Sequence, residues 1–156
     1  MTAPNFSSED IPFKLRDATA ADASFVLWLE EISMKDHAIA LWGSWRSSAS
    51  LENYDLANHQ IVDCEGQAVG CVAYRLTDQY LRLNRIFLNP AFQNRGLGAR
   101  ILREITSLAD SLGLATKLEV LVTNNSALKF YLREGFVVSK VTAEKRTLIK
   151  QPILHR

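Results

Sequence analysis

The sequence lacks any long apolar run. A helix that spans a membrane needs roughly 18 consecutive apolar residues, and no stretch of this chain approaches that length. The segment at 1–13, MTAPNFSSEDIPF, has neither the basic start nor the apolar centre of a secretion signal. We therefore expect a cytoplasmic protein that does not bind membranes.

An excess of one charge is also missing. Lys and Arg number 18 against 17 for Asp and Glu, which gives a formal net charge of +1. A flat polyanion such as duplex DNA binds a strongly basic surface, so we expect no nucleic-acid partner.

Cysteine is scarce as well. The two cysteines, Cys64 and Cys71, flank EGQAVG, in which Glu65-Gly66 is typical of a hairpin turn. In that register Cys64 faces Gln67, so the two thiols are not opposite each other. We expect no disulfide, and no metal-ligand spacing is present, so no metal is predicted.

The rest of the composition is typical of a soluble globular protein. Of the 156 residues, 47% are hydrophobic and 22% are charged. This length favours one domain over 1–156, with its core at 13–150. No internal repeat, low-complexity segment or linker is visible.

Hydrophobic periodicity and turn residues predict the elements along the chain. Strands are expected near 13–17, 59–66, 67–76, 79–90, 116–123, 136–141 and 146–151, and helices near 20–33, 34–45, 97–112 and 124–135. A helical turn is expected in the polar stretch 46–58. The order β-α-α-β-β-β-α-β-α-β-β predicts an α/β (α+β) fold, a mostly β sheet with helices on both faces.

The hexapeptide QNRGLG at 93–98 joins a predicted strand to a predicted helix. A Rossmann fingerprint would need a third glycine at the position of Ile101. A P-loop would need four residues between its glycines, followed by Lys-Ser or Lys-Thr, and only Leu97 separates Gly96 from Gly98. Neither template fits.

The physics of such a loop still indicates an anion site. The first amides of a helix have no internal partner and together carry about half a positive charge. Gly96 and Gly98 have no Cβ to hold a ligand away from the backbone, and Arg95 adds a full charge. The loop therefore predicts a seat for a phosphate or pyrophosphate, with a tight turn that binds nothing as the alternative.

A second motif follows one predicted strand later, in TNNSALKFYLREGF. The two motifs and the order of elements over 13–150 resemble the GCN5-related N-acetyltransferase (GNAT) family, with its Q/R-x-x-G-x-G/A and N-x-x-A-x-x-x-Y-x-x-x-G-F patterns. The matching residues are Gln93, Gly96, Gly98, Asn124, Ala127, Tyr131, Gly135 and Phe136. The resemblance implies a central, mixed, mostly antiparallel twisted sheet of about six to seven strands.

The resemblance implies acetyl-coenzyme A (acetyl-CoA) as the cosubstrate. The loop would hold the pyrophosphate by its backbone, and the strand end would pair with the pantetheine arm like another strand. This requires the strands at 81–88 and 118–123 to separate, with Asn124 bonding the pantetheine or the local backbone. The implied binding residues are Ile86, Phe87, Leu88, Gln93, Asn94, Arg95, Gly96, Leu97, Gly98, Ala99 and Asn124.

The implied chemistry is acyl transfer to a primary amine in a ternary complex. An amine with a pKa near 10.4 is neutral only about once in a few thousand molecules at pH 7, so a group must accept a proton. The resemblance assigns the acid that protonates the thiolate to Tyr131 and the base to Glu119, with Asn84 or a bound water as alternatives. A backbone N–H near Leu88 is the expected oxyanion donor.

The family binds its acceptor mainly with the first two helices and the last hairpin. Here those regions carry Trp28, Trp42 and Trp45. An aromatic wall for a cationic amine is one interpretation. We favour the other, in which Trp42 packs in the core and Trp45 covers an edge.

Four further polar side chains lie in the same region. We expect His37 to be a helix-surface residue. Glu30, Glu31 and Asp36 could attract an amine, but we expect them to belong to a solvated helix face.

Two other functions stay open at this point. One is an acyl-CoA sensor on the same fold without turnover, and the other is a nucleotide-binding domain. For the enzyme, the acceptor is a small-molecule amine or a peptide amine, and a homodimer stays open.

Overall fold

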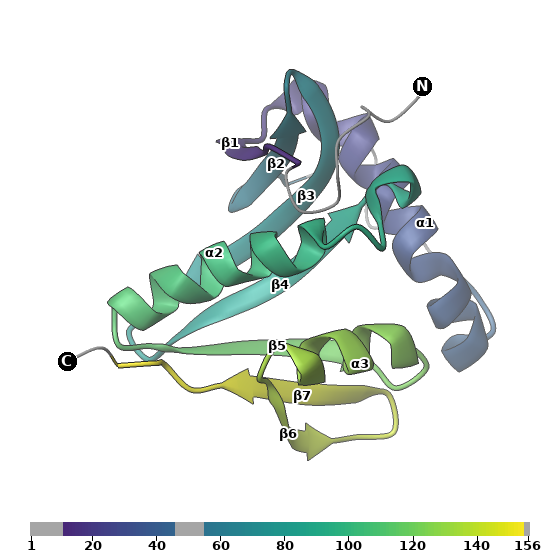
Figure 1. The fold of residues 1–156 in the computed structure, drawn as a ribbon. Helices are drawn as coiled ribbons and strands as arrows, with labels where there is room; N and C mark the ends of the chain where they lie inside the picture. Colours follow the sequence, from purple (N-terminus) through teal and green to yellow (C-terminus); the bar gives the residue numbers. More distant parts are fainter. Residues whose placement is uncertain (1–10, 46–54, 155–156) are drawn as a thin grey trace.

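The computed structural model describes residues 11–45 and 55–154 and places seven strands in one sheet (Figure 1). In spatial order the strands are β1 (Lys14–Asp17), β2 (His59–Cys64), β3 (Gln67–Leu76), β4 (Tyr80–Leu88), β5 (Ala115–Leu121), β7 (Lys145–Lys150) and β6 (Val137–Val141). All neighbours pair antiparallel except β4 and β5, which are parallel. The predicted mixed, mostly antiparallel sheet is confirmed.

The N-terminal helical region differs from the prediction. The helices expected over 20–33 and 34–45 form one helix, α1 (Ala23–Trp42), after the 3-10 turn η1 (Ala20–Asp22). No glycine or proline interrupts the chain near Ser33, so the helix continues to Gly43, whose φ of 77° ends it. Most of the stretch in which a helical turn was expected, 46–54, lies outside the described residues.

Two further helices complete the fold, α2 (Leu97–Ser111) and α3 (Asn125–Arg133), with the 3-10 turn η3 (Pro90–Phe92) after β4. In the described ranges, no helix is both long enough and apolar enough to cross a bilayer.

Each face of the sheet carries its own core. Alternation along a strand sends neighbouring side chains to opposite faces. Thus Val62 and Val72 join the larger core with α2 and α3, whereas Ile61 and Cys71 join the smaller core under α1. Helices therefore cover both faces, as predicted.

The predicted hairpin between β2 and β3 is confirmed. Glu65 and Gly66 form its turn with φ of 52° and 86°, and Cys64 pairs with Gln67. Both cysteines are free and buried. Within the part of the chain that the structure describes, no three His, Cys, Asp or Glu side chains group as a metal site.

Candidate active site

The sheet opens between its two parallel strands. β4 and β5 pair only from Tyr80 opposite Ala115 to Arg82 opposite Lys117, although β4 runs on to Leu88. Figure 1 shows the two strands diverging beyond that point. The separation of these two strands, which the binding of acetyl-CoA would require, is therefore present.

A β-bulge lies on β4 just beyond the point of separation. Arg85 pairs with Ala73 and Leu83 pairs with Tyr74, so Asn84 has no partner of its own on β3. Bulges redirect side chains and bend the strand, and they are frequent beside active sites. Asn84 thus lies at the start of the opening.

The end of β4 offers backbone groups to the opening. The N–H of Asn89 donates to the carbonyl of Val69 on β3, at 2.8 Å. Since successive peptide groups of a strand point to opposite sides, the N–H of Leu88 is directed away from β3, into the opening. The Leu88 carbonyl on that side accepts a hydrogen bond from Gln93 Nε2, at 3.0 Å, which anchors the loop to the strand end.

The start of α2 faces the same opening. Its N-cap is Gly96, with φ of 79° and no side-chain cap, and Asn94 also has a positive φ, 60°. The left-handed conformation at Gly96 turns the chain so that the first helical amides are presented together. A Cβ added at Gly98 would lie 3.7 Å from Leu88 Cδ1, an ordinary contact.

One cavity of about 790 Å³ collects most of the predicted site. Its lining includes Ile86, Phe87, Leu88, Gln93, Asn94, Gly96, Gly98, Ala99, Glu119, Asn124 and Tyr131. The structure places Arg95 and Leu97 outside this lining. Leu97 is fully buried in the core, so only its backbone could serve a ligand, and the Arg95 guanidinium lies 6.0 Å from the centre of the Phe92 ring.

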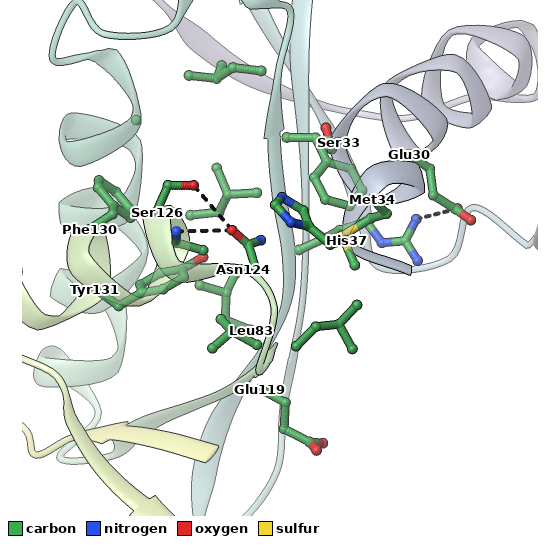
Figure 2. A pocket seen from close by; sticks show the side chains of 18 of the residues that line it. Glu30, Ser33, Met34, His37, Leu83, Glu119, Asn124, Ser126, Phe130 and Tyr131 are labelled. Atoms are coloured by element: carbon green, nitrogen blue, oxygen red, sulfur yellow. Dashed lines mark hydrogen bonds and ion pairs between the residues drawn. The ribbon is translucent and has the colours of Figure 1, made fainter. Parts of the chain in front are cut away.

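Asn124 caps the helix α3 (Figure 2). Its Oδ1 accepts hydrogen bonds from the N–H of Ala127 at 3.1 Å and from Ser126 Oγ at 3.3 Å. Of the two roles expected for this side chain, the bond to the local backbone is therefore present.

Tyr131 is a buried tyrosine that lines the cavity. Its ring packs edge-on against Phe130 and Phe136, with centroid distances of 5.0 and 5.5 Å. No hydrogen bond of its hydroxyl is found among the described residues, and Figure 2 shows that hydroxyl on the cavity side of the ring. Burial raises the pKa of Tyr131 above its usual value, so the phenol stays protonated at neutral pH.

Glu119 lies where β4 and β5 begin to separate. Its carboxylate forms an ion pair with Arg82, and both side chains are about one-third exposed. The hydrogen bond from Arg82 holds the pKa of Glu119 below its usual value, and Arg82, Lys145 and Lys140 act in the same direction through their charge. Glu119 is therefore ionised at neutral pH but is a weaker base than a free glutamate.

The opposite wall of the cavity comes from α1, and here the expectation for Glu30 is wrong. Glu30 is not solvated: it is 5% exposed and pairs with Arg85 at 3.0 Å. His37 is half-buried and lines the cavity together with Met34 (Figure 2). The spacing of four and three residues places Glu30, Met34 and His37 on one face of a continuous helix. A prediction of two helices that break after Ser33 conceals this signal.

The interpretation that Trp42 packs in the core is also wrong. Trp42 is 50% exposed, lines the cavity, and donates from Nε1 to Glu144 Oε2 at 2.8 Å. Trp45 lines the cavity too. Trp28 packs instead against Phe25, with ring centroids 6.1 Å apart.

A comparison with protein-family models supplies the family. A model described as the acetyltransferase (GNAT) domain matches residues 55–138, more than half of the chain. The chain belongs to this family. The matched GNAT segment contains the whole opening between β4 and β5, the start of α2, and Tyr131.

Solved structures share the fold of this GNAT chain at low sequence identity. The PaiA N-acetyltransferase of Thermoplasma acidophilum in complex with coenzyme A matches with a TM-score of 0.70 and 15% identity, over 90% of this chain and 99% of that one. The ribosomal-protein-S18-alanine N-acetyltransferase of Escherichia coli gives 0.67 and 16%, over 93% and 97%. An acetyltransferase of Thermus thermophilus gives 0.68 and 19%, over 89% and 96%. No curated protein sequence matches this chain.

Proposed function

We propose that this chain transfers an acetyl group from acetyl-CoA to a primary amine of a small molecule or peptide, by direct attack in a ternary complex. The observation that carries the proposal is the meeting of three features in one cavity. These are the unpaired end of β4, the uncapped start of α2 and the hydroxyl of Tyr131. A cytoplasmic location stays a prediction from the sequence.

The residues present fit coenzyme A. The N–H of Leu88 is directed into the opening between the strands, where an extended arm could pair with it as a strand would. The first amides of α2 suit a diphosphate, because they carry partial positive charge and the N-cap is Gly96. Acetyl-CoA, once bound, supplies an activated thioester.

Tyr131 is proposed as the donor to the departing sulfur. Its raised pKa keeps the proton in place at neutral pH, and the absence of a hydroxyl partner among the described residues leaves that proton available. A phenol with a pKa above that of a thiol gives a hydrogen bond more readily than a proton. Complete transfer is favoured only if the same dry surroundings raise the pKa of the thiol as well.

Glu119 is proposed as the proton acceptor on the amine side. It lines the cavity and is ionised, but its pairing with Arg82 lowers its basicity. The proton could pass from the amine to Glu119 through an intervening water, so that the two groups need not be in direct contact. Asn84, at the bulge, is a further polar group that could hold this water.

The same pairing favours a second candidate function. A carboxylate held by Arg82 serves structure as readily as catalysis, so an acyl-CoA sensor without turnover is the alternative. The sensor would bind coenzyme A through the same backbone groups and would not need Glu119 or Tyr131 to exchange protons.

Thiol release separates these functions. Coenzyme A binding is measured first by calorimetry, and then release of free thiol from acetyl-CoA is followed with a panel of small amines, amino acids and short peptides. We expect binding and amine-dependent release. Binding with no release for any amine would favour the sensor, and a chain that binds a dinucleotide but not coenzyme A would overturn both.

A further inference from the structure

Positive side chains outnumber negative ones around Glu119, on the side of the cavity where we place the amine. Arg82, Lys145 and Lys140 all act on the carboxylate of Glu119. Arg82 and Lys145 line the cavity together with Glu119, whereas Lys140 lies on the neighbouring strand β6. Three cations therefore surround one carboxylate.

Part of this positive charge is not neutralised. Arg82 pairs with Glu119, but neither Lys140 nor Lys145 forms a side-chain ion pair with another described residue. The other arginine that lines the cavity differs, because Arg85 pairs with the buried Glu30. Cations without ion-pair partners beside a cavity attract anionic ligands and orient them.

We propose that the acceptor is an amine that also carries an anionic group, a carboxylate or a phosphate, and that Arg82 and Lys145 bind this group. The inference rests on the proposed function, since it names the class of its acceptor. Arginine presents a planar fork of donors that matches either anion, and Lys145 adds a mobile point charge.

Binding of the anion has a consequence for Glu119. An anion that takes donors of Arg82 weakens the hydrogen bond that holds the pKa of Glu119 down. The carboxylate then becomes a stronger base when the acceptor is in place. Recognition of the acceptor and activation of the base are thus coupled through one arginine.

A binding experiment tests the charge preference without knowledge of the natural acceptor. The protein is loaded with coenzyme A, so that the diphosphate seat is filled, and is titrated with succinate, with neutral succinamide of similar shape, or with inorganic phosphate. Tryptophan fluorescence is the readout, because Trp42 and Trp45 line the cavity. We expect succinate, phosphate or both to bind about three- to tenfold more tightly than succinamide, and the anion that binds identifies the source.

Charge variants locate the binding. Lys145→Gln and Arg82→Gln should abolish most of the preference for anions, whereas the conservative Lys145→Arg should keep it. Lys14→Gln is the control, because Lys14 is exposed on the far edge strand β1, and it should leave the preference unchanged. Lys145 is exposed, so its variants should fold even if Arg82→Gln does not. Equal binding of succinamide and both anions, or a preference unaffected by Lys145→Gln, would overturn the inference.

A kinetic arm keeps this inference separate from the proposed function. Thiol release is compared for amine pairs that differ only in a carboxylate or its amide, such as glycyl-glycine and glycyl-glycinamide. Release that is faster with the acid supports the inference, and equal rates contradict it. If coenzyme A binds and no amine releases thiol, the proposed function fails, whereas the succinate titration still decides whether the anion site exists.

Discussion

The two sides of the cavity are built in different ways. The proposed cofactor side, made of the end of β4, the loop 93–99 and the start of α3, uses backbone groups held by short-range contacts such as Gln93 to Leu88. The proposed acceptor side, made of α1, the Arg82–Glu119 pair and the β6–β7 turn, uses side chains from distant parts of the chain, such as Trp42 and Glu144. Local motifs can specify the first kind of site, but only the folded chain assembles the second.

The largest expected effect concerns Tyr131, the proposed proton donor in the cavity. Tyr131→Phe removes the hydroxyl and keeps the ring contacts with Phe130 and Phe136. We expect kcat to fall about 100- to 10,000-fold, the usual contribution of a positioned proton donor, with unchanged affinity for coenzyme A. Steady-state kinetics and calorimetry measure the two quantities.

The control for this variant is Tyr74→Phe, at a partly buried tyrosine of β3 that does not line the cavity. Because burial raises the pKa of Tyr131, wild-type activity should show no loss from its ionisation below about pH 10. A Tyr131→Phe enzyme that keeps full kcat would exclude the phenol as the proton donor.

The next largest effect separates two glycines of the cofactor side. Gly96 has a φ of 79°, so Gly96→Ala adds strain of about 1–2 kcal/mol in that conformation. If the loop relaxes, its amides turn away and coenzyme A must restore them, which weakens binding roughly 5- to 30-fold. Calorimetric titration with coenzyme A measures the loss.

Gly98→Ala is the matched control in the same loop. Gly98 lies within α2, and its added Cβ would meet only ordinary contacts with Leu88 and Phe130. Its affinity for coenzyme A should stay within about threefold of wild type, because alanine is a good helix former. If both variants lose the same affinity for coenzyme A, the diphosphate site depends on the space left by the missing Cβ atoms and not on the backbone conformation of Gly96.

The same contrast explains what the sequence could predict. The strands, the hairpin at Glu65-Gly66 and the start of α2 follow from local patterns, and they are confirmed. The continuity of α1 was missed, because two apolar patches on either side of Ser33 do not reveal that one helix joins them. The exposure of Trp42 was missed because its partner, Glu144, lies 102 residues away.

Charged groups were the hardest to place for a related reason. A glutamate on a helix is solvated by default, and only the approach of Arg85 from β4 allows Glu30 to be 5% exposed. Likewise the family resemblance implies Glu119 as the base, but its pairing with Arg82 depends on where β4 and β5 separate.

A third prediction tests the electrostatics of the acceptor side. In the wild type, the hydrogen bond from Arg82 lowers the pKa of Glu119 below the usual 4.5. The pair therefore stabilises the fold above about pH 4.5, and this stability is lost as the pH falls through the lowered pKa. In Arg82→Gln the carboxyl should titrate at higher pH, as followed by carbon-13 NMR, with Lys14→Gln as the control.

The titration midpoints of Glu119 in the wild type and in Arg82→Gln show whether Arg82 holds the pKa of the carboxyl down. An unchanged midpoint in Arg82→Gln would show that Lys145 and Lys140 alone hold the carboxylate, and that removing the arginine does not make Glu119 a stronger base.

The smallest effect is expected at the bridge between α1 and the β6–β7 turn. Glu144→Ala removes the acceptor of the Trp42 Nε1 hydrogen bond, which is exposed, so the free energy of unfolding should fall by less than about 1 kcal/mol. The effect on acceptor binding should be of a similar size, because Trp42 lines the cavity. Acceptor KM should change two- to fivefold, and kcat at saturation should stay unchanged.

A double variant tests whether the hydrogen bond between Trp42 and Glu144 is responsible. If it is, Trp42→Phe and Glu144→Ala together should change KM no more than Trp42→Phe alone. Additive changes would mean that the two side chains act on the acceptor separately.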